Sequence, residues 1–192
     1  MTSLIHNKQR GFTLIEMMVS LALFTVVITI AAGAFLSLIG NNGKLQGEQS
    51  VMTTLSFALD SMSREIRTGS HYYCRSAAPV MDTELTRDCA TSANTLSFTE
   101  GGSSLSAGAG SERIAYSYDG NLLTRQVGED GAEEPIVSDE IKLKNVKFIV
   151  TNTADDDQVQ PTVTIVIEAA DPDDATKVYT LQTTVVQRQL DI

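Results

Sequence analysis

The chain begins with a long apolar stretch, and a helical repeat and a series of alternating segments follow it. Residues 17–39 carry no charged side chain. As an α-helix this stretch would be about 35 Å long, enough to cross a hydrocarbon core of about 30 Å. A buried core helix is the alternative, but the length and the charge-free run favour a transmembrane helix over residues 12–39.

A second helical pattern occupies residues 40–69. The segment Gly40–Gly43 is poor in helix-forming residues, and we expect a bend or a local loss of helix there. Beyond it, apolar residues recur at helical spacing and predict an amphipathic continuation that packs on the chain's own β-rich part. These residues are Leu45, Met52, Leu55, Leu59, Met62 and Ile66. Glu48 interrupts the repeat, so an independent coiled coil is not favoured, and Gly69 is expected to cap the helix.

Residues 70–192 show the two-residue alternation of β-strands. Asp119-Gly120 separates two alternating runs and predicts a hairpin turn. A change of phase near Asn145 predicts a bulge. The expected strands are 95–99, 114–118, 122–127, 141–150, 163–167 and 178–187. The predicted fold class is therefore α+β, with an antiparallel sheet packed on the second half of a long N-terminal helix.

The net charge of the chain argues against one class of partner, and the basic residues near its N-terminus indicate its orientation in a membrane. The 192 residues include 14 Lys+Arg and 24 Asp+Glu, which gives a formal net charge of −10. Nucleic-acid binding needs a basic surface, so we predict no nucleic-acid partner. Lys8 and Arg10 precede the apolar stretch, and the positive-inside rule then places the N-terminus in the cytoplasm and residues 70–192 outside.

The junction before the apolar stretch reads Lys8-Gln9-Arg10-Gly11-Phe12-Thr13-Leu14-Ile15-Glu16. This segment resembles the prepilin processing motif of type IV pilins and type II secretion pseudopilins. The resemblance implies a pilin-like fold and a leader at residues 1–11, which prepilin peptidase removes by cleavage between Gly11 and Phe12. It further implies methylation of the new N-terminal amine on Phe12.

The same resemblance implies a role for Glu16 in assembly. A carboxylate at the edge of a membrane helix is costly and calls for a partner. In the family, this glutamate neutralises the N-terminal amine of a neighbouring subunit. The implied partners are other pilin or pseudopilin subunits and an inner-membrane assembly platform. The implied location is the inner membrane and afterwards an extracytoplasmic filament.

A looser resemblance links the β-rich part to minor subunits of the family, of the J type in secretion pseudopili and the W type in type IV pili. It implies that the chain is a minor subunit. The matching stretches are Tyr116-Ser117-Tyr118, Leu123-Thr124-Arg125, Asn145-Val146-Lys147-Phe148, Pro161 and Val185-Val186-Gln187-Arg188.

Two alternatives to this interpretation stay open. Ala32-Gly33-Ala34 has the A-x-A pattern at which signal peptidase could cut, although the apolar run continues beyond it. The chain could also be a single-pass anchor for a β-rich binding or adhesion domain that does not polymerise. An enzyme is not predicted, because neither H-E-x-x-H nor G-x-S-x-G occurs and His71 is the only histidine beyond the leader.

Two further groups of residues bear on stability and ligands. Cys74 and Cys89 lie in the part expected outside the membrane, where a disulfide would add about 3 kcal/mol of stability in the loop-entropy model. No resident cofactor is predicted. Calcium is the one candidate ligand, because acidic residues cluster between strands, but solvated turns are the favoured interpretation since no EF-hand pattern occurs. The candidate calcium ligands are Asp155, Asp157, Asp171 and Asp173.

Overall fold

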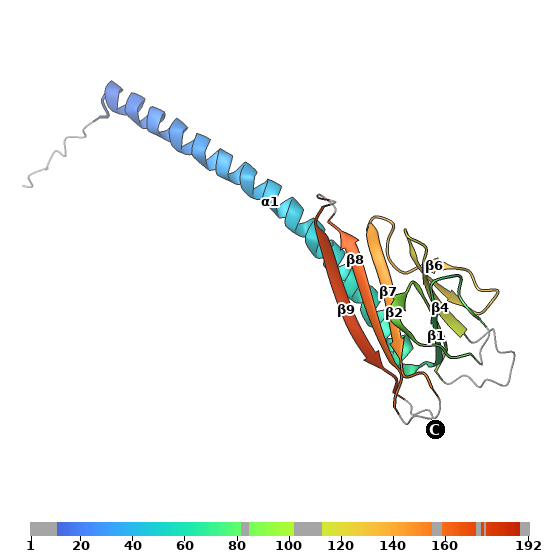
Figure 1. The fold of residues 1–192 in the computed structure, drawn as a ribbon. Helices are drawn as coiled ribbons and strands as arrows, with labels where there is room; N and C mark the ends of the chain where they lie inside the picture. Colours follow the sequence, from blue (N-terminus) through green and yellow to red (C-terminus); the bar gives the residue numbers. More distant parts are fainter. Residues whose placement is uncertain are drawn as a thin grey trace, which may run out of the picture. The chain divides into compact units, whose positions relative to one another are not determined.

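A computed structural model gives the fold, and it describes residues 11–81, 85–101, 113–154, 159–171, 174 and 176–188. One long helix, α1, precedes a series of strands (Figure 1). The chain divides into two compact units, Met1–Leu45 and Gln46–Ile192, and we call the second the head unit. The elements are α1 (Leu14–Thr68), β1 (Ser70–Arg75), β2 (Cys89–Ala93), β3 (Thr95–Thr99), β4 (Arg113–Tyr118), β5 (Leu123–Val127), β6 (Glu134–Pro135), β7 (Leu143–Thr151), β8 (Thr162–Ala170) and β9 (Val178–Val186).

The strands form two antiparallel sheets. The first has the order β1-β3-β4-β5-β6 and the second the order β2-β7-β8-β9. Together with α1 they confirm the α+β prediction and a pilin-like arrangement. We expected a single sheet, and the structure has two. The strands divide because β2 pairs with β7, whereas β1 pairs with β3, so β1 and β2 lie at the edges of different sheets.

Most of the predicted strands lie where the alternation indicated. The hairpin of β4 and β5 turns at Asp119-Gly120, with Tyr118 opposite Leu123. The register between β7 and β8 shifts between Leu143 and Asn145, which confirms the predicted bulge. Ile141 precedes β7 rather than belonging to it. Strands β1, β2 and β6 were not predicted, because their short sequences lack an apolar alternation.

The head unit's part of α1 buries one face. The buried residues recur every three or four positions and are Val51, Leu55, Ala58, Leu59, Met62 and Ile66. Met52 and Leu45 were expected on this face, but they are 42% and 54% exposed. On a straight helix, two residues seven positions apart differ in direction by about 20°. Apolar residues at this spacing therefore turn gradually away from the core toward the N-terminal end of α1. Gly40–Gly43 is helical, so the predicted loss of helix is wrong.

The core of the head unit joins α1 to both sheets. Its buried cluster combines the α1 residues with Phe98 of β3, Tyr116 of β4, Phe148 of β7 and Ile165 of β8. The ring of Phe98 lies 6.0 Å from both Tyr72 and Tyr116, measured between centroids. Such tilted aromatic contacts and the apolar area they bury are the main source of stability in a core of this kind.

Gly69 ends α1 for a reason that the sequence pattern does not reveal. Its amide donates to the carbonyl oxygens of Glu65 and Ile66, each at 3.1 Å. Gly69 is absent from the residues with positive φ, so it does not form the left-handed cap that we expected. A Cβ atom at this position would instead collide with the ring of Phe98, so the glycine permits the close approach of α1 and β3.

Candidate processing and assembly site

The bond between Gly11 and Phe12 lies outside the helix. Gly11, Phe12 and Thr13 have no regular secondary structure, and α1 begins at Leu14. The Phe12 side chain is 78% exposed. A bond before the first helical turn is not protected by helical hydrogen bonds, so a peptidase can reach it without unwinding α1.

Thr13 and Glu16 define the first turn of α1. The Glu16 amide donates to Oγ1 of Thr13 at 3.3 Å, and the Met17 amide donates to the Thr13 carbonyl oxygen at 3.2 Å. Thr13 is therefore the N-cap, and Glu16 occupies the third helical position, as in a capping box. A carboxylate at this position is also favoured by the positive end of the helix dipole.

The membrane-length part of α1 exposes its apolar side chains on all sides. It contains a window of mean hydropathy 2.4 in which no residue is buried within the chain. A core helix would be covered by its own protein, so the lack of cover supports a membrane or filament environment. Thr25 and Thr29 donate their hydroxyls to the carbonyl oxygens of Ala22 and Thr25, at 2.8 and 2.7 Å, which removes two donors from contact with lipid.

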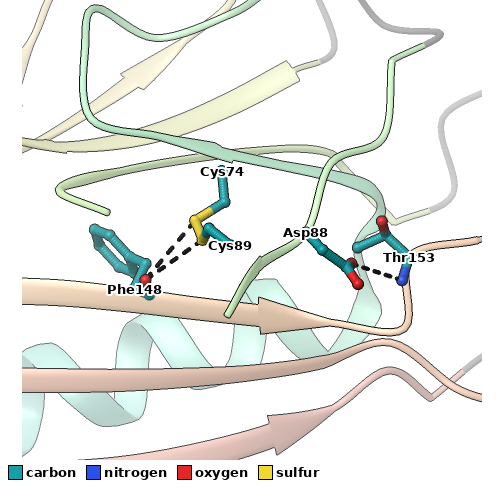
Figure 2. The surroundings of a disulfide bond; sticks show 5 residues. All are labelled: Cys74, Asp88, Cys89, Phe148 and Thr153. Atoms are coloured by element: carbon teal, nitrogen blue, oxygen red, sulfur yellow. Dashed lines mark hydrogen bonds between the residues drawn. A yellow bond between two sulfur atoms is a disulfide. The ribbon is translucent and has the colours of Figure 1, made fainter. Parts of the chain in front are cut away.

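The predicted pairing of Cys74 with Cys89 is present (Figure 2). Cys74 lies in β1 and Cys89 in β2, so the bridge joins the edges of the two sheets, with the Cα atoms 5.8 Å apart. Both sulfur atoms face the carbonyl oxygen of Phe148, at 3.7 and 3.5 Å. The sequence indicated the pair of cysteines but not that they connect two sheets.

Asp88 reinforces the same junction. Its carboxylate accepts hydrogen bonds from the amides of Asn152 and Thr153, at 3.2 and 3.0 Å, just after β7 (Figure 2). Asn152 has a φ of 61°, in the left-handed region that asparagine tolerates better than most residues. The residue before the bridged Cys89 thus holds the turn at the end of β7.

Glu65 connects α1 to the first sheet through two polar contacts that the sequence did not reveal. Its Oε2 atom accepts a hydrogen bond from the Tyr116 hydroxyl at 2.5 Å and pairs with Nε of Arg125 at 3.0 Å. Burial and the hydrogen bond to Glu65 raise the pKa of Tyr116. The predicted hairpin already places Tyr116 opposite Arg125, but nothing local in the sequence points to Glu65 as their common partner.

Only one of the four calcium candidates, Asp171, belongs to the described residues. Asp155, Asp157 and Asp173 lie outside them, so the structure does not test the proposed cluster. Asp171 is 6% exposed and accepts hydrogen bonds from the Tyr179 hydroxyl at 2.6 Å and the Asp174 amide at 3.2 Å. The Lys177 ammonium lies 3.4 Å away. Within the described part of the chain, no three metal-binding side chains converge. Calcium stays an untested candidate, beside the favoured interpretation of solvated turns.

His71 lies between α1 and the rest of β1. Its φ is 52°, and its Nδ1 atom is 3.1 Å from the hydroxyl oxygen of the neighbouring Ser70.

Comparison with known proteins identifies the N-terminal segment. Residues 6–32 match the family model described as the prokaryotic N-terminal methylation motif. No curated protein and no solved structure matches the chain. The matched residues include Gly11, Phe12 and Glu16 and the first part of α1. The chain therefore carries, over residues 6–32, the N-terminal signature of type IV pilins and pseudopilins.

Proposed function

We propose that this chain is a structural subunit of a type IV pilus or a type II secretion pseudopilus. Prepilin peptidase removes residues 1–11, Phe12 is methylated, and the apolar part of α1 then packs in the filament. The observation that carries the proposal is the methylation motif over residues 6–32, placed directly before the N-cap of a long, uncovered apolar helix.

The geometry of the first turn supports a specific use of Glu16 in assembly. Cleavage creates an α-amine at Phe12, whose ordinary pKa of about 7.7–8.0 leaves it largely cationic at neutral pH. The positive end of the helix dipole disfavours this cation, and an apolar surrounding disfavours it further. Glu16, in the same first turn, supplies the opposite charge to the amine of a neighbouring subunit, which fixes the axial step between subunits.

A minor role within the filament is the finer part of the proposal. The likeness of its strand sequences to J-type and W-type subunits supports it. Before assembly the subunit resides in the inner membrane with its N-terminus in the cytoplasm, and an assembly platform transfers it to the filament.

A membrane-anchored binding domain that does not polymerise is the second candidate. The open apolar surface of α1 supports an anchor as well as a filament core. The two functions differ in what they require of Glu16, because an anchor that does not polymerise has no neighbouring amine for the carboxylate to neutralise.

The Glu16→Ala variant separates these functions. We expect normal leader removal, since the N-cap Thr13 and the Gly11–Phe12 bond are unchanged, and at least about a tenfold loss of incorporation, because an uncompensated amine costs more than about 1.4 kcal/mol. Incorporation is measured as the amount of the chain in sheared, purified filaments relative to the amount in the membrane.

Glu140→Ala is the matched control, because Glu140 is an exposed glutamate of the head unit. It should leave incorporation unchanged. Wild-type incorporation of Glu16→Ala would contradict the assembly role of Glu16. Absence of the wild-type chain from purified filaments would contradict the filament function and leave the membrane anchor as the better explanation.

A further inference from the structure

The outer edge of β9 is a long and unprotected strand edge. β9 pairs with β8 through nine consecutive residue pairs without a register shift. Among the described strands, none pairs with its other side, and Figure 1 draws β9 at the border of its sheet. An unpaired edge offers a row of backbone donors and acceptors to any extended chain that reaches it.

The sequence of β9 lacks the features by which proteins protect such edges. Residues 178–187 contain no charged residue, proline or glycine. Proteins that stay monomeric usually place lysine, proline or a bulge on an exposed edge. By contrast, β6, at the border of the other sheet, is a two-residue strand made of Glu134 and Pro135. The borders formed by β6 and β9 thus have opposite chemistry.

A groove lies beside this edge and provides space for side chains of an added strand. It lies between α1 and β9, has a volume of about 400 Å³, and is lined by Leu59, Asp60 and Arg67 of α1 and by Leu181, Gln182 and Thr183 of β9. A strand added to β9 would direct every second side chain to the α1 side of the sheet. The groove therefore offers space to the alternate side chains of such a strand.

A second copy of this chain does not fit the edge in head-to-tail fashion. Such a contact needs a second regular edge of similar length. The other described borders are the two-residue β6, the six-residue β1 and the five-residue β2. β1 shifts its register between Ser70 and Tyr73, β2 shifts its register between Cys89 and Ala93, and the two are bridged to each other. None of the three matches nine uninterrupted residues.

Symmetric pairing of two β9 strands is the main rival, because the outward row of β9 has a palindromic order of residue types. These residues are Val178, Thr180, Gln182, Thr184 and Val186. β9, however, runs in the same direction as the head unit's part of α1, since Lys177 pairs with Glu48 at 2.6 Å and the Arg188 amide donates to the Arg67 carbonyl oxygen at 2.8 Å. Antiparallel pairing would place the two Gln46 entry points at opposite ends of the pair. Under the proposed function the subunits of one filament enter it from the same membrane, so this pairing does not suit them.

We propose that the outer edge of β9 accepts an extended, uncharged strand from a different filament subunit, whose alternate side chains fill the groove between α1 and β9. This inference rests on the proposed function, because it takes the partner from the same filament. Backbone hydrogen bonds supply the affinity, and the groove selects the side chains.

Photo-crosslinking in intact producing cells tests the proposal. A benzoylphenylalanine residue replaces Gln182, or Thr91 of β2 as the matched position on the opposite border of the same sheet. We expect an adduct from position 182 and none from position 91. Mass spectrometry of the adduct should identify another chain with a prepilin-type N-terminus, linked through a non-helical segment.

Edge variants show whether strand pairing is responsible. Thr180→Lys with Val186→Lys, in the chain that carries the crosslinker at position 182, should lower the adduct yield at least about tenfold, because lysine on an exposed edge strand opposes the addition of a further strand. Thr180 lies opposite Glu168 of β8, so its lysine gains an opposite charge within the fold. Thr91→Lys is the control and should leave the yield unchanged. Disulfide formation and the urea midpoint of each variant establish that it folds.

Several results would overturn the proposal. They are a homodimeric adduct, an adduct with a chain that lacks the N-terminal motif, no adduct from position 182, or a yield that the folded lysine variants do not change. If the lysine variants fail to fold, the presence and identity of the adduct from position 182 alone decide whether the proposal holds. Failure of the proposed function is a separate result, since it is measured by the absence of the wild-type chain, with β9 intact, from sheared and purified filaments.

Discussion

At the scale of single residues, long-range polar contacts hold the head unit together in ways that local patterns do not encode. Glu65 accepts a hydrogen bond from Tyr116 and pairs with Arg125, and Asp88 accepts hydrogen bonds from the turn after β7. The sequence predicted the hairpin that aligns Tyr116 with Arg125. It could not predict Glu65 as their partner, because that pairing depends on how the helix packs on the sheet.

The Tyr116 contact predicts a stability loss at alkaline pH. The pKa of Tyr116 is raised above its ordinary value of 10.0, chiefly by burial. The neutral phenol is therefore favoured in the folded state, so its contribution is complete below about pH 10 and is lost as the pH rises through the raised folded value. Tyr116→Phe should flatten this alkaline decrease, measured as the urea midpoint of the full-length chain in detergent between pH 8 and about 11.

Glu65→Gln serves as the companion variant. It keeps a hydrogen-bond acceptor near Tyr116 but removes the charge that pairs with Arg125, so it should lower stability at neutral pH while leaving an alkaline decrease. An equally steep alkaline decrease in the wild type and in Tyr116→Phe would show that Tyr116 does not cause it.

At the scale of elements, the alternation of apolar residues predicted strands whose inward faces are largely apolar. β4, β5, β7, β8 and β9 are of this kind. β1 and β2 were missed because Ser70–Arg75 and Cys89–Ala93 are largely polar or small, and their positions depend on the disulfide and on pairing with distant strands. The helical repeat wrongly predicted that Leu45 and Met52 are buried, because residues seven positions apart do not stay on one face of a straight helix.

The junction of α1 and β3 gives a prediction at this scale. Gly69→Ala should destabilise the head unit by about 1–3 kcal/mol, because the added methyl group collides with the Phe98 ring and overpacks the core. Urea unfolding of the full-length chain in detergent measures the effect. Phe98→Leu should be less harmful in the Gly69→Ala background than alone, since the smaller side chain relieves the collision.

Gly43→Ala is the matched control for this prediction. Gly43 lies within α1, whereas Gly69 follows its last residue, and a Cβ at position 43 meets no atom within 4 Å. The substitution should leave the unfolding of the head unit unchanged. Equal effects of the two substitutions would indicate that contact with Phe98 does not limit position 69.

At the scale of the whole molecule, function divides between two parts with different chemistry. The apolar part of α1 and the motif before it were evident from the sequence, because nine consecutive residues, Lys8–Glu16, bear the processing pattern. The edge of β9 was not evident, because an alternating strand has the same sequence pattern at the centre of a sheet and at its border. Only the topology shows which edge stays open.

The central claim, that leader removal at one bond converts this chain into a filament subunit, is tested most directly at its N-terminus. Mass spectrometry of the N-terminal peptide, from the protein in its native membrane and filament fractions, should find a chain that begins with N-methylated Phe12. Gly11→Ala should leave the leader in place, because the motif requires glycine before the cut. A mature chain that begins at Phe35, or normal cleavage of Gly11→Ala, would contradict the account.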